Sequence, residues 1–224
     1  ITVKIWDITD FNNINLVSEY LGENNLAHNV HVKDNQLFIS HYTTGMKIVD
    51  IYNPEKPVEV AAYDTYSNND SGGFYGCWGA YPFTNNNYVY ASDMQNGLYI
   101  FSFEDIRAGF VNGHIYFNNN IPLQNSSIMS MLNNKEYFTD ENGYFDIGFS
   151  QGEHQFIING EEIITIIFEP LQTLTSNYYI GDNLILGDIN NDSIIDVLDI
   201  ILVINFIMQT STPTIEEHWT SDLN

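Results

Sequence analysis

The feature that most restricts the fold of this chain is an internal repeat in its first half. Residues 3–8 (VKIWDI) recur as residues 46–51 (MKIVDI), an offset of 43 residues. A weaker copy at residues 97–101 follows residues 45–49 at an offset of 52. Each copy is a β-branched or aromatic run bounded by Asn, Asp, Gly or Pro, a pattern typical of strands and turns. We therefore expect an all-β repeat architecture here.

The best-defined copy contains four strand-like runs between Ala27 and Asp64. They lie at residues 27–33, 36–43, 45–51 and 57–64. Four short strands at a period of about 40–50 residues are the signature of a β-propeller blade. The pattern therefore predicts propeller blades rather than isolated hairpins.

The residues of these runs also resemble a known family. Residues 45–60 (GMKIVDIYNPEKPVEV) resemble the LVIVD repeat, and residues 78–83 with 92–98 are similar to the last blades of choice-of-anchor B surface proteins. The resemblance extends over residues 1–105. It implies a partial β-propeller of about two and a half blades, which we assign to residues 1–108. Open blades leave strand edges uncovered, so we expect the isolated part to depend on absent neighbours.

Residues 109–180 form a second region of short strand-like runs separated by turn residues. The runs lie at residues 113–117, 138–147, 152–158 and 162–167. Within 138–147, the pair Asn142-Gly143 suits a tight turn with positive φ and predicts a hairpin. Several short strands in about 70 residues indicate a small β-sandwich.

This second region resembles the carboxypeptidase regulatory-like, or transthyretin-like, domain. The resemblance rests on the segments VNGHI at 111–115, TDENGYF at 139–145 and GEH at 152–154. It implies that residues 109–180 are a non-catalytic spacer or binding module.

A twelve-residue acidic loop near the end of the chain carries the most specific chemical pattern. Its positions 1, 3, 5, 7, 9 and 12 are Asp188, Asn190, Asp192, Ile194 (through its backbone carbonyl), Asp196 and Asp199. This is the spacing of an EF-hand-like loop, in which hard oxygen ligands surround Ca²⁺. The four carboxylates repel one another unless a cation neutralises them, so the loop predicts Ca²⁺ as cofactor and calcium-coupled folding.

Two residues of the acidic loop depart from the usual pattern. Ser193 replaces the glycine of the sharp bend, and Asp199 is shorter than the usual Glu. An alternative interpretation of the same residues is an Asp/Asn-rich turn that caps the next helix.

Residues 197–208 follow the loop and are apolar on nearly every face, so we expect a helix that needs a partner to bury it. Loop and helix together resemble the first repeat of a type I dockerin, which places a dockerin-like module at 181–224. Asp222 and Asn224 are similar to the first and third positions of a second, truncated repeat, and are further metal ligands under this resemblance. The resemblance implies attachment to a cohesin-like or other surface protein.

Composition excludes several classes of function. Asp and Glu number 29 against 6 Lys and Arg, a formal net charge of −23. Such a chain lacks the cationic side chains needed to bind nucleic acid or an anionic lipid surface. The longest apolar stretch, 194–208, is too short to cross a membrane. The single cysteine, Cys77, cannot form an intrachain disulfide.

Strong acidity also fits a protein that binds cations or stays soluble outside the cell. No signal-peptide pattern is present. The chain begins inside a strand-like run and stops inside a dockerin-like pattern, so we expect a longer polypeptide that is secreted or displayed at the cell surface.

These patterns predict a non-catalytic, extracellular attachment module that works through calcium. One alternative is a component of a polysaccharide-degrading system, with a glycan-binding, hydrolytic or metal site on the propeller. Its candidate residues are His28, Asn29, His31, His41, Asp50 and Asp93. Another alternative is a loop that only rigidifies a linker and recruits no partner. A polysaccharide is a further candidate partner.

Overall fold

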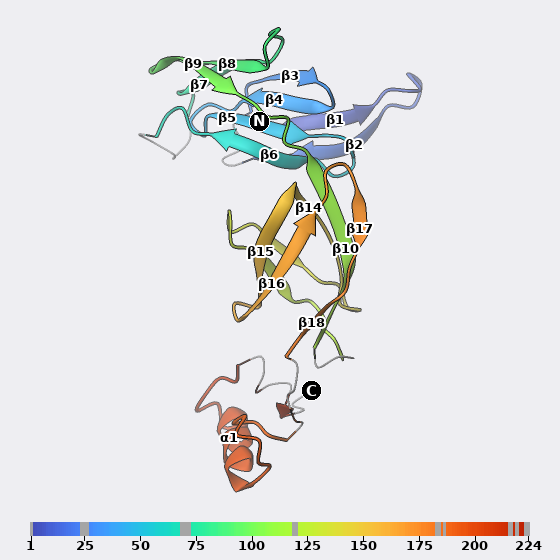
Figure 1. Cartoon of the computed structure of the whole chain (residues 1–224), viewed down its shortest axis with the longest axis vertical. Helices are drawn as coiled ribbons and strands as arrows, with labels where there is room; N and C mark the ends of the chain where they lie inside the picture. Colours follow the sequence, from blue (N-terminus) through green and yellow to red (C-terminus); the bar gives the residue numbers. More distant parts are fainter. Residues whose placement is uncertain are drawn as a thin grey trace. The chain divides into compact units, whose positions relative to one another are not determined.

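The computed structural model describes residues 2–22, 27–67, 73–117, 121–181, 185, 187–214, 217, 220 and 221. These residues form a mainly β structure of several antiparallel sheets, with one short helix near the C-terminal end (Figure 1). The predicted fold class is confirmed at this level. The sheets of the described residues do not close into a propeller ring.

The chain divides into two compact units. The first contains Ile1–Val111, Gly148–Gly152 and Ile167–Leu174. The second contains Asn112–Ile147, Glu153–Ile166 and Thr175–Asn224. Two short segments from the middle of the chain therefore fold with the N-terminal unit.

The second copy of the repeat is a four-stranded antiparallel sheet in the order β3-β4-β5-β6. Its strands are β3 (Asn29–Lys33), β4 (Gln36–Ser40), β5 (Met46–Asp50) and β6 (Val58–Tyr63). Each lies inside one of the four predicted runs, so these strands are confirmed. Every residue of β4 and β5 is buried, because both strands are central in the sheet and side chains on both of their faces pack in apolar clusters.

The first copy repeats half of this sheet with the same geometry. Its strands, β1 (Val3–Asp7) and β2 (Asn15–Tyr20), pair antiparallel and lie 43 residues before β5 and β6. Val3 pairs with Tyr20 as Met46 pairs with Tyr63. A β-bulge follows the third residue of β1 and of β5. Because bulges are specific features of a strand pair, the repeat is one of structure as well as sequence.

The third copy forms a three-stranded antiparallel sheet in the order β7-β8-β9. Its strands are β7 (Cys77–Tyr81), β8 (Tyr88–Asp93) and β9 (Gly97–Ser102). Ser92 pairs with Leu98 as Ser40 pairs with Met46, which reproduces the offset of 52. At that offset the fourth strand would be 110–115, but these residues belong to β10 and pair elsewhere, so β9 is an edge strand.

Apolar side chains of the second and third copies share one core in the first unit. The buried members are Phe38, Met46, Ile48, Val58, Val60, Cys77, Ala80, Val89, Ala91, Ala108 and Phe110. A second cluster packs the first copy against the second through Tyr20, Ala27, Leu37, Ile39 and Val49. Successive copies are thus held together by burial of their facing side chains.

Two further sheets use the strands from β10 onward. One has the order β13-β12-β15-β16, and in the other β10 pairs with β11, β14, β17 and β18. The strands are β10 (Ala108–Phe117), β11 (Ile121–Pro122), β12 (Ser127–Ser130), β13 (Glu136–Phe138), β14 (Tyr144–Ser150), β15 (Gly152–Ile158), β16 (Glu162–Phe168), β17 (Thr173–Thr175) and β18 (Tyr178–Ile180). Alternate residues of β14 and β16 are buried, as expected for strands with one covered face.

The predicted hairpin at 138–147 is wrong. The strands β13 and β14 flank the expected turn, but β13 pairs with β12 whereas β14 pairs with β10. The turn itself is present: Gly143 has a φ of +74°, and the Asp140 carboxylate accepts the backbone N–H groups of Asn142 and Tyr144. A turn signal specifies a reversal of the chain, and burial then selects the partner of each strand.

The helix α1 (Val197–Ile207) lies within the predicted helical segment. It begins directly after the acidic loop, and Asp196 is its N-cap residue. In the described part of the chain, no helix is both long enough and apolar enough to cross a lipid bilayer.

Candidate functional site

The acidic loop is held by hydrogen bonds from backbone N–H groups to its carboxylates. Asp188, at position 1, is only 1% exposed. Its two carboxylate oxygens accept the N–H groups of Asp192 and Ser193, at 3.0 and 2.8 Å. The Asn190 side-chain oxygen accepts the same Asp192 N–H at 3.0 Å. The first half of the loop is therefore wrapped around its first carboxylate.

Asp199, at position 12, closes the loop from the helix side and is also only 1% exposed. Its Oδ1 accepts the N–H of Ile189 at 2.7 Å and that of Asn190 at 3.2 Å. Its Oδ2 accepts the Asp196 N–H at 2.8 Å. These hydrogen bonds, that of Asp196 foremost, hold the pKa of Asp199 below its ordinary value.

Asp196 and Asp199 together form a capping box at the start of α1. The Asp196 carboxylate accepts the Leu198 N–H at 2.7 Å, while Asp199 accepts the Asp196 N–H. The box satisfies N–H groups that have no partner within the helix. The capping interpretation of these two residues is thus confirmed, and it leaves other lone pairs of the same carboxylates available.

Ser193 occupies the sharp bend with a φ of +68°. This is the left-handed region that glycine adopts at little cost and other residues avoid. The residue at position 6, where the EF-hand-like pattern has glycine, therefore takes a glycine-like conformation, and serine adopts it with strain.

The oxygen ligands of the acidic loop are of the type that a hard cation prefers. Each carboxylate offers about four lone pairs. Asp188 accepts two hydrogen bonds from backbone N–H groups and Asp199 accepts three, so each carboxylate retains at least one free lone pair. The Ile194 carbonyl oxygen accepts no hydrogen bond from any described residue. All the ligand atoms predicted at positions 1, 3, 5, 7, 9 and 12 therefore keep free acceptor capacity.

In the arrangement described, these side chains are not gathered into a closed centre. Among the described residues, no three His, Cys, Asp or Glu side chains stand together as a metal-binding group. Asp222 and Asn224, the predicted ligands of the second repeat, lie outside the described residues. The calcium assignment of all eight residues stays a prediction.

The loop and helix carry an exposed apolar surface. Only Asp199 and Phe206 of α1 are buried, whereas its large aliphatic side chains are mostly exposed, Ile200 at 58% and Ile204 at 51%. A hollow of about 400 Å³ beside the loop is lined by apolar residues such as Ile189, Ile195 and Val203. Most apolar side chains of α1 are therefore exposed to solvent in the described structure.

The buried Thr220 also supports the acidic loop, although the sequence analysis did not identify it. Its carbonyl oxygen accepts the N–H of Gly187, the residue before the loop, at 2.8 Å. Its side chain also borders the hollow beside the loop. No local signal marks this role, because the contact joins residues far apart in the sequence.

The histidines of the first unit have separate surroundings. His28 Nδ1 donates a hydrogen bond to the Trp78 carbonyl oxygen at 2.8 Å, and the centroid of its ring lies 4.3 Å from that of Trp78. His31 lies edge-on to Phe83 at 5.6 Å. His41 is fully buried. The candidate site on the propeller therefore gains no support from these contacts of its histidines.

Asp50 and Asp93, the carboxylates considered for catalysis, hold structural elements together. Asp50 is 1% exposed, and its Oδ2 lies 3.0 Å from Arg107 Nε. The Asp93 carboxylate accepts the Thr65 hydroxyl at 2.7 Å and the backbone N–H groups of the turn that follows. Both carboxylates are engaged with neighbouring protein groups.

Cys77 behaves as a small apolar core residue. It is fully buried in the shared core of the second and third copies. Burial raises the pKa of its thiol to about 12, so the nucleophilic thiolate is scarce at neutral pH.

Comparisons with known proteins give little help. No family model and no curated protein matches the chain. Among solved structures, the chain is similar to a DUF3823 family protein from Parabacteroides merdae, with 12% identity and a TM-score of 0.26. The match covers 34% of this chain and 46% of that one, so this chain spans less than half of that protein.

Proposed function

We propose that this chain is part of a secreted or cell-surface protein that is attached to a partner through a calcium-binding, dockerin-like module. In this proposal the repeats of the first unit are LVIVD-type propeller blades, as in choice-of-anchor B proteins. The strands that follow form a carboxypeptidase regulatory-like sandwich that acts as a spacer. The partner is a cohesin-like or other surface protein, and no step in this chain is catalytic.

The observation that carries the calcium assignment is the burial of two carboxylates in one twelve-residue loop. Asp188 and Asp199 are each 1% exposed, and no cationic side chain is hydrogen-bonded to either in the described residues. Buried carboxylates have lost the hydration that stabilises their charge, and they repel each other. A nearby positive charge compensates for both energetic costs. A bound Ca²⁺ would supply that charge, and Asn190, Asp192, Asp196 and the Ile194 carbonyl would complete its oxygen shell.

The protein-attachment part of the proposal rests on the surface that follows the loop. Apolar side chains on α1 and the adjoining hollow are exposed to water at a cost of roughly 25 cal/mol per Å² relative to burial. Contiguous exposed apolar surface of this kind is typical of interaction sites. A loop that fixes the start of α1 when Ca²⁺ binds would make this surface depend on calcium.

The propeller interpretation is supported by the repeated register of the first unit. The first copy shares the strand bounds, pairing and bulge of β5 and β6 in the second copy, and the third copy shares the pairing of β4 with β5. The sandwich interpretation is supported by the alternating burial of β14 and β16. The propeller and sandwich assignments are therefore proposals that go beyond the mainly β fold class.

Calcium titration of the 224-residue chain by calorimetry tests the ligand assignment. Wild-type protein should bind Ca²⁺ with measurable heat, and Asp188→Asn and Asp199→Asn should each weaken binding at least about tenfold because each removes a charged ligand. Asp10→Asn, which changes an exposed aspartate of the first unit, is the matched control and should bind as wild type. Equal heats for all four proteins would defeat the assignment.

Attachment is tested separately with a purified type I cohesin. The chain should be retained on immobilised cohesin in Ca²⁺ and released by a chelator. If calcium binds but no cohesin is retained, the calcium site stands and the docking part of the proposal is wrong.

A further inference from the structure

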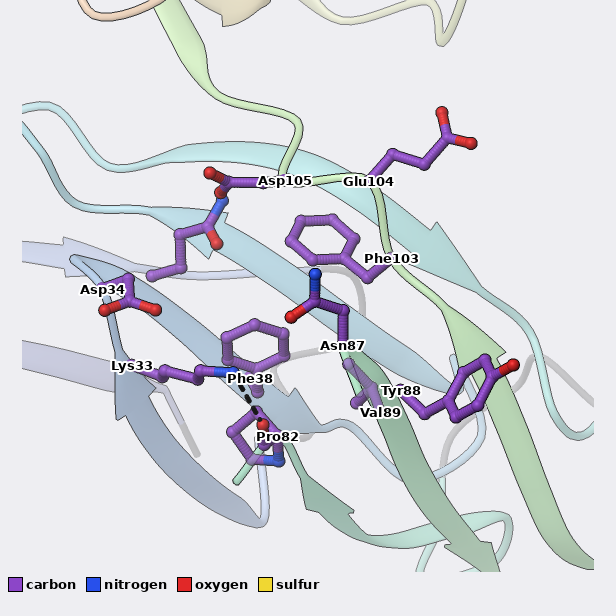
Figure 2. Close-up of a pocket in the computed structure, with 11 residues that line it drawn as sticks. Lys33, Asp34, Phe38, Pro82, Asn87, Tyr88, Val89, Phe103, Glu104 and Asp105 are labelled. Atoms are coloured by element: carbon purple, nitrogen blue, oxygen red, sulfur yellow. Dashed lines mark hydrogen bonds between the residues drawn. The ribbon is translucent and has the colours of Figure 1, made fainter. Parts of the chain in front are cut away.

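A pocket of about 260 Å³ lies in the first unit (Figure 2). Four stretches line it: the turn between β3 and β4, the residue after β7, the turn before β8, and residues 103–105 after β9. It therefore lies where the second and third copies of the repeat meet. The sequence analysis did not identify it, because its walls come from segments about 50 residues apart.

Buried polar groups fix the walls of this pocket. Arg107 is 8% exposed and donates through Nη1 to the Asp34 carbonyl at 2.8 Å and to the Asp105 carboxylate at 3.2 Å. Gln36 is 2% exposed and donates to the Ile106 carbonyl at 2.8 Å. The segment after β9 is thus fastened to the turn between β3 and β4, so the pocket is built into the fold.

The floor of the pocket is aromatic. Phe38 and Phe103 meet edge to face, with ring centroids 5.8 Å apart. Asn87 lines the same pocket, and Figure 2 draws its side chain with these two rings. Asn87 has a φ of +58°, a conformation that asparagine tolerates better than most residues. Asn87 lies in the turn before β8 and lines the pocket.

Three polar side chains beside this floor have unused hydrogen-bonding capacity. The Lys33 ammonium donates one N–H to the Pro82 carbonyl at 3.1 Å and has two more. The Asn87 amide and the Asp34 carboxylate make no side-chain hydrogen bond to any described residue. The pocket thus presents a donor, an acceptor and a group that is both, next to an apolar ring face.

This combination selects a small ligand with hydroxyl groups around its edge and C–H groups on its faces. The volume is slightly below the roughly 300–1,000 Å³ of drug-sized sites, which suits a single ring. Carboxylates on Asp34, Glu104 and Asp105 oppose an anionic ligand, and the polar mouth disfavours a purely apolar one. We propose that the pocket binds one neutral pyranose residue, such as the end of a glycan.

This proposal is independent of the calcium module and survives its failure. Saturation-transfer NMR of the 224-residue chain tests it with the methyl glycosides of glucose, galactose, mannose and xylose at millimolar concentration. At least one should receive saturation at its ring C–H protons, which contact the aromatic floor. The methyl glycoside of glucuronic acid should bind at least about tenfold more weakly than its neutral counterpart, because of the carboxylates.

Two asparagine variants give the matched comparison. Asn87→Asp keeps the shape and the tolerated backbone but removes both N–H donors, so binding should weaken about tenfold. Asn85→Asp makes the same charge change in the same turn, outside the pocket lining, and should leave binding unchanged. Absence of saturation transfer to every glycoside, a preference for the glucuronide, or equal effects of the two variants would each overturn the proposal.

Discussion

Ser193 is the residue at which the acidic loop stores most backbone strain. Its φ of +68° costs an L-residue roughly 1–2 kcal/mol, a penalty that glycine does not have. The greater freedom of glycine in the unfolded chain offsets part of that gain. We expect Ser193→Gly to stabilise the folded loop by about 1 kcal/mol, which corresponds to roughly fivefold tighter Ca²⁺ binding in a calorimetric titration.

Ser211→Gly serves as the comparison for this change. Ser211 is exposed beyond the end of α1 and does not have a positive φ. The Ser211→Gly variant should bind calcium with the same affinity as the wild-type protein. Tightening in both variants, or in neither, would show that strain at position 6 of the loop is not what limits binding.

Asp140 gives a prediction about pH in the turn between β13 and β14. The backbone N–H groups of Tyr144 and Asn142 hold the pKa of its carboxyl below the ordinary value of 3.8. Because the folded pKa is lowered, the charged form contributes stability above the unfolded pKa and loses it as pH falls through the folded pKa. Asp140→Asn should therefore be less stable than wild type at pH 7.

The difference between the two proteins should disappear in acid, once Asp140 is protonated in wild type. Denaturant unfolding followed by circular dichroism at neutral and acidic pH measures both values. A stability difference that does not change with pH would mean that the shape of the side chain, rather than its charge, holds this turn.

At the scale of elements, the repeat supplies its own matched pair of glycines. Gly45 immediately precedes β5, the equivalent Gly97 is the first residue of β9, and both have positive φ, +80° and +88°. A Cβ at Gly45 would lie 2.0 Å from the Tyr63 carbonyl oxygen, whereas a Cβ at Gly97 meets nothing within 4 Å. The missing fourth strand of the third copy explains this difference.

We expect Gly97→Ala to cost about 1–2 kcal/mol, from the backbone conformation alone. Gly45→Ala should cost a further 1–3 kcal/mol or so, because the β5–β6 pair must move to admit the methyl group. Chemical denaturation of each variant measures the difference. Equal losses would indicate that the β5–β6 pair yields without cost at this point.

The strands β5 and β9 also show how the same repeat element differs with its surroundings. Met46 and Ile48 of β5 are 3% and 2% exposed, whereas the equivalent Leu98 and Ile100 of β9 are 66% and 58% exposed. The third copy packs against the β5 side chains, and no described segment covers those of β9. Terminal repeats of an array leave such faces open.

At the scale of the whole molecule, the chain contains two compact units, and the acidic loop belongs to the second. A ligand that binds only the folded state stabilises the unit that holds its site, by about 2.7 kcal/mol at a concentration 100 times its Kd. In a calorimetric melting experiment, calcium should therefore raise the melting temperature of the unit that contains the loop. The melting temperature of the first unit should not change.

The Asp188→Asn variant should abolish this calcium-dependent shift. An equal rise of every transition in wild type would mean that the two units unfold together, or that calcium binds in the first unit. Either result would contradict the proposed placement of the site.

Local features of this molecule could be predicted from its sequence. The four runs between residues 27 and 64 are strands, and residues 197–207 are a helix with Asp196 as N-cap. Each depends on side-chain alternation, capping or backbone preference within a few residues, and short-range physics decides these features.

The tertiary structure decided which segments become partners. The turn at Asn142-Gly143 was evident from the sequence, yet its flanking strands joined different sheets. The expected fourth strand of the third copy became part of β10, and the pocket beside Asn87 formed from turns distant in the sequence. These outcomes depend on which apolar faces bury one another, and local residue patterns leave several pairings open until the whole chain competes for that burial.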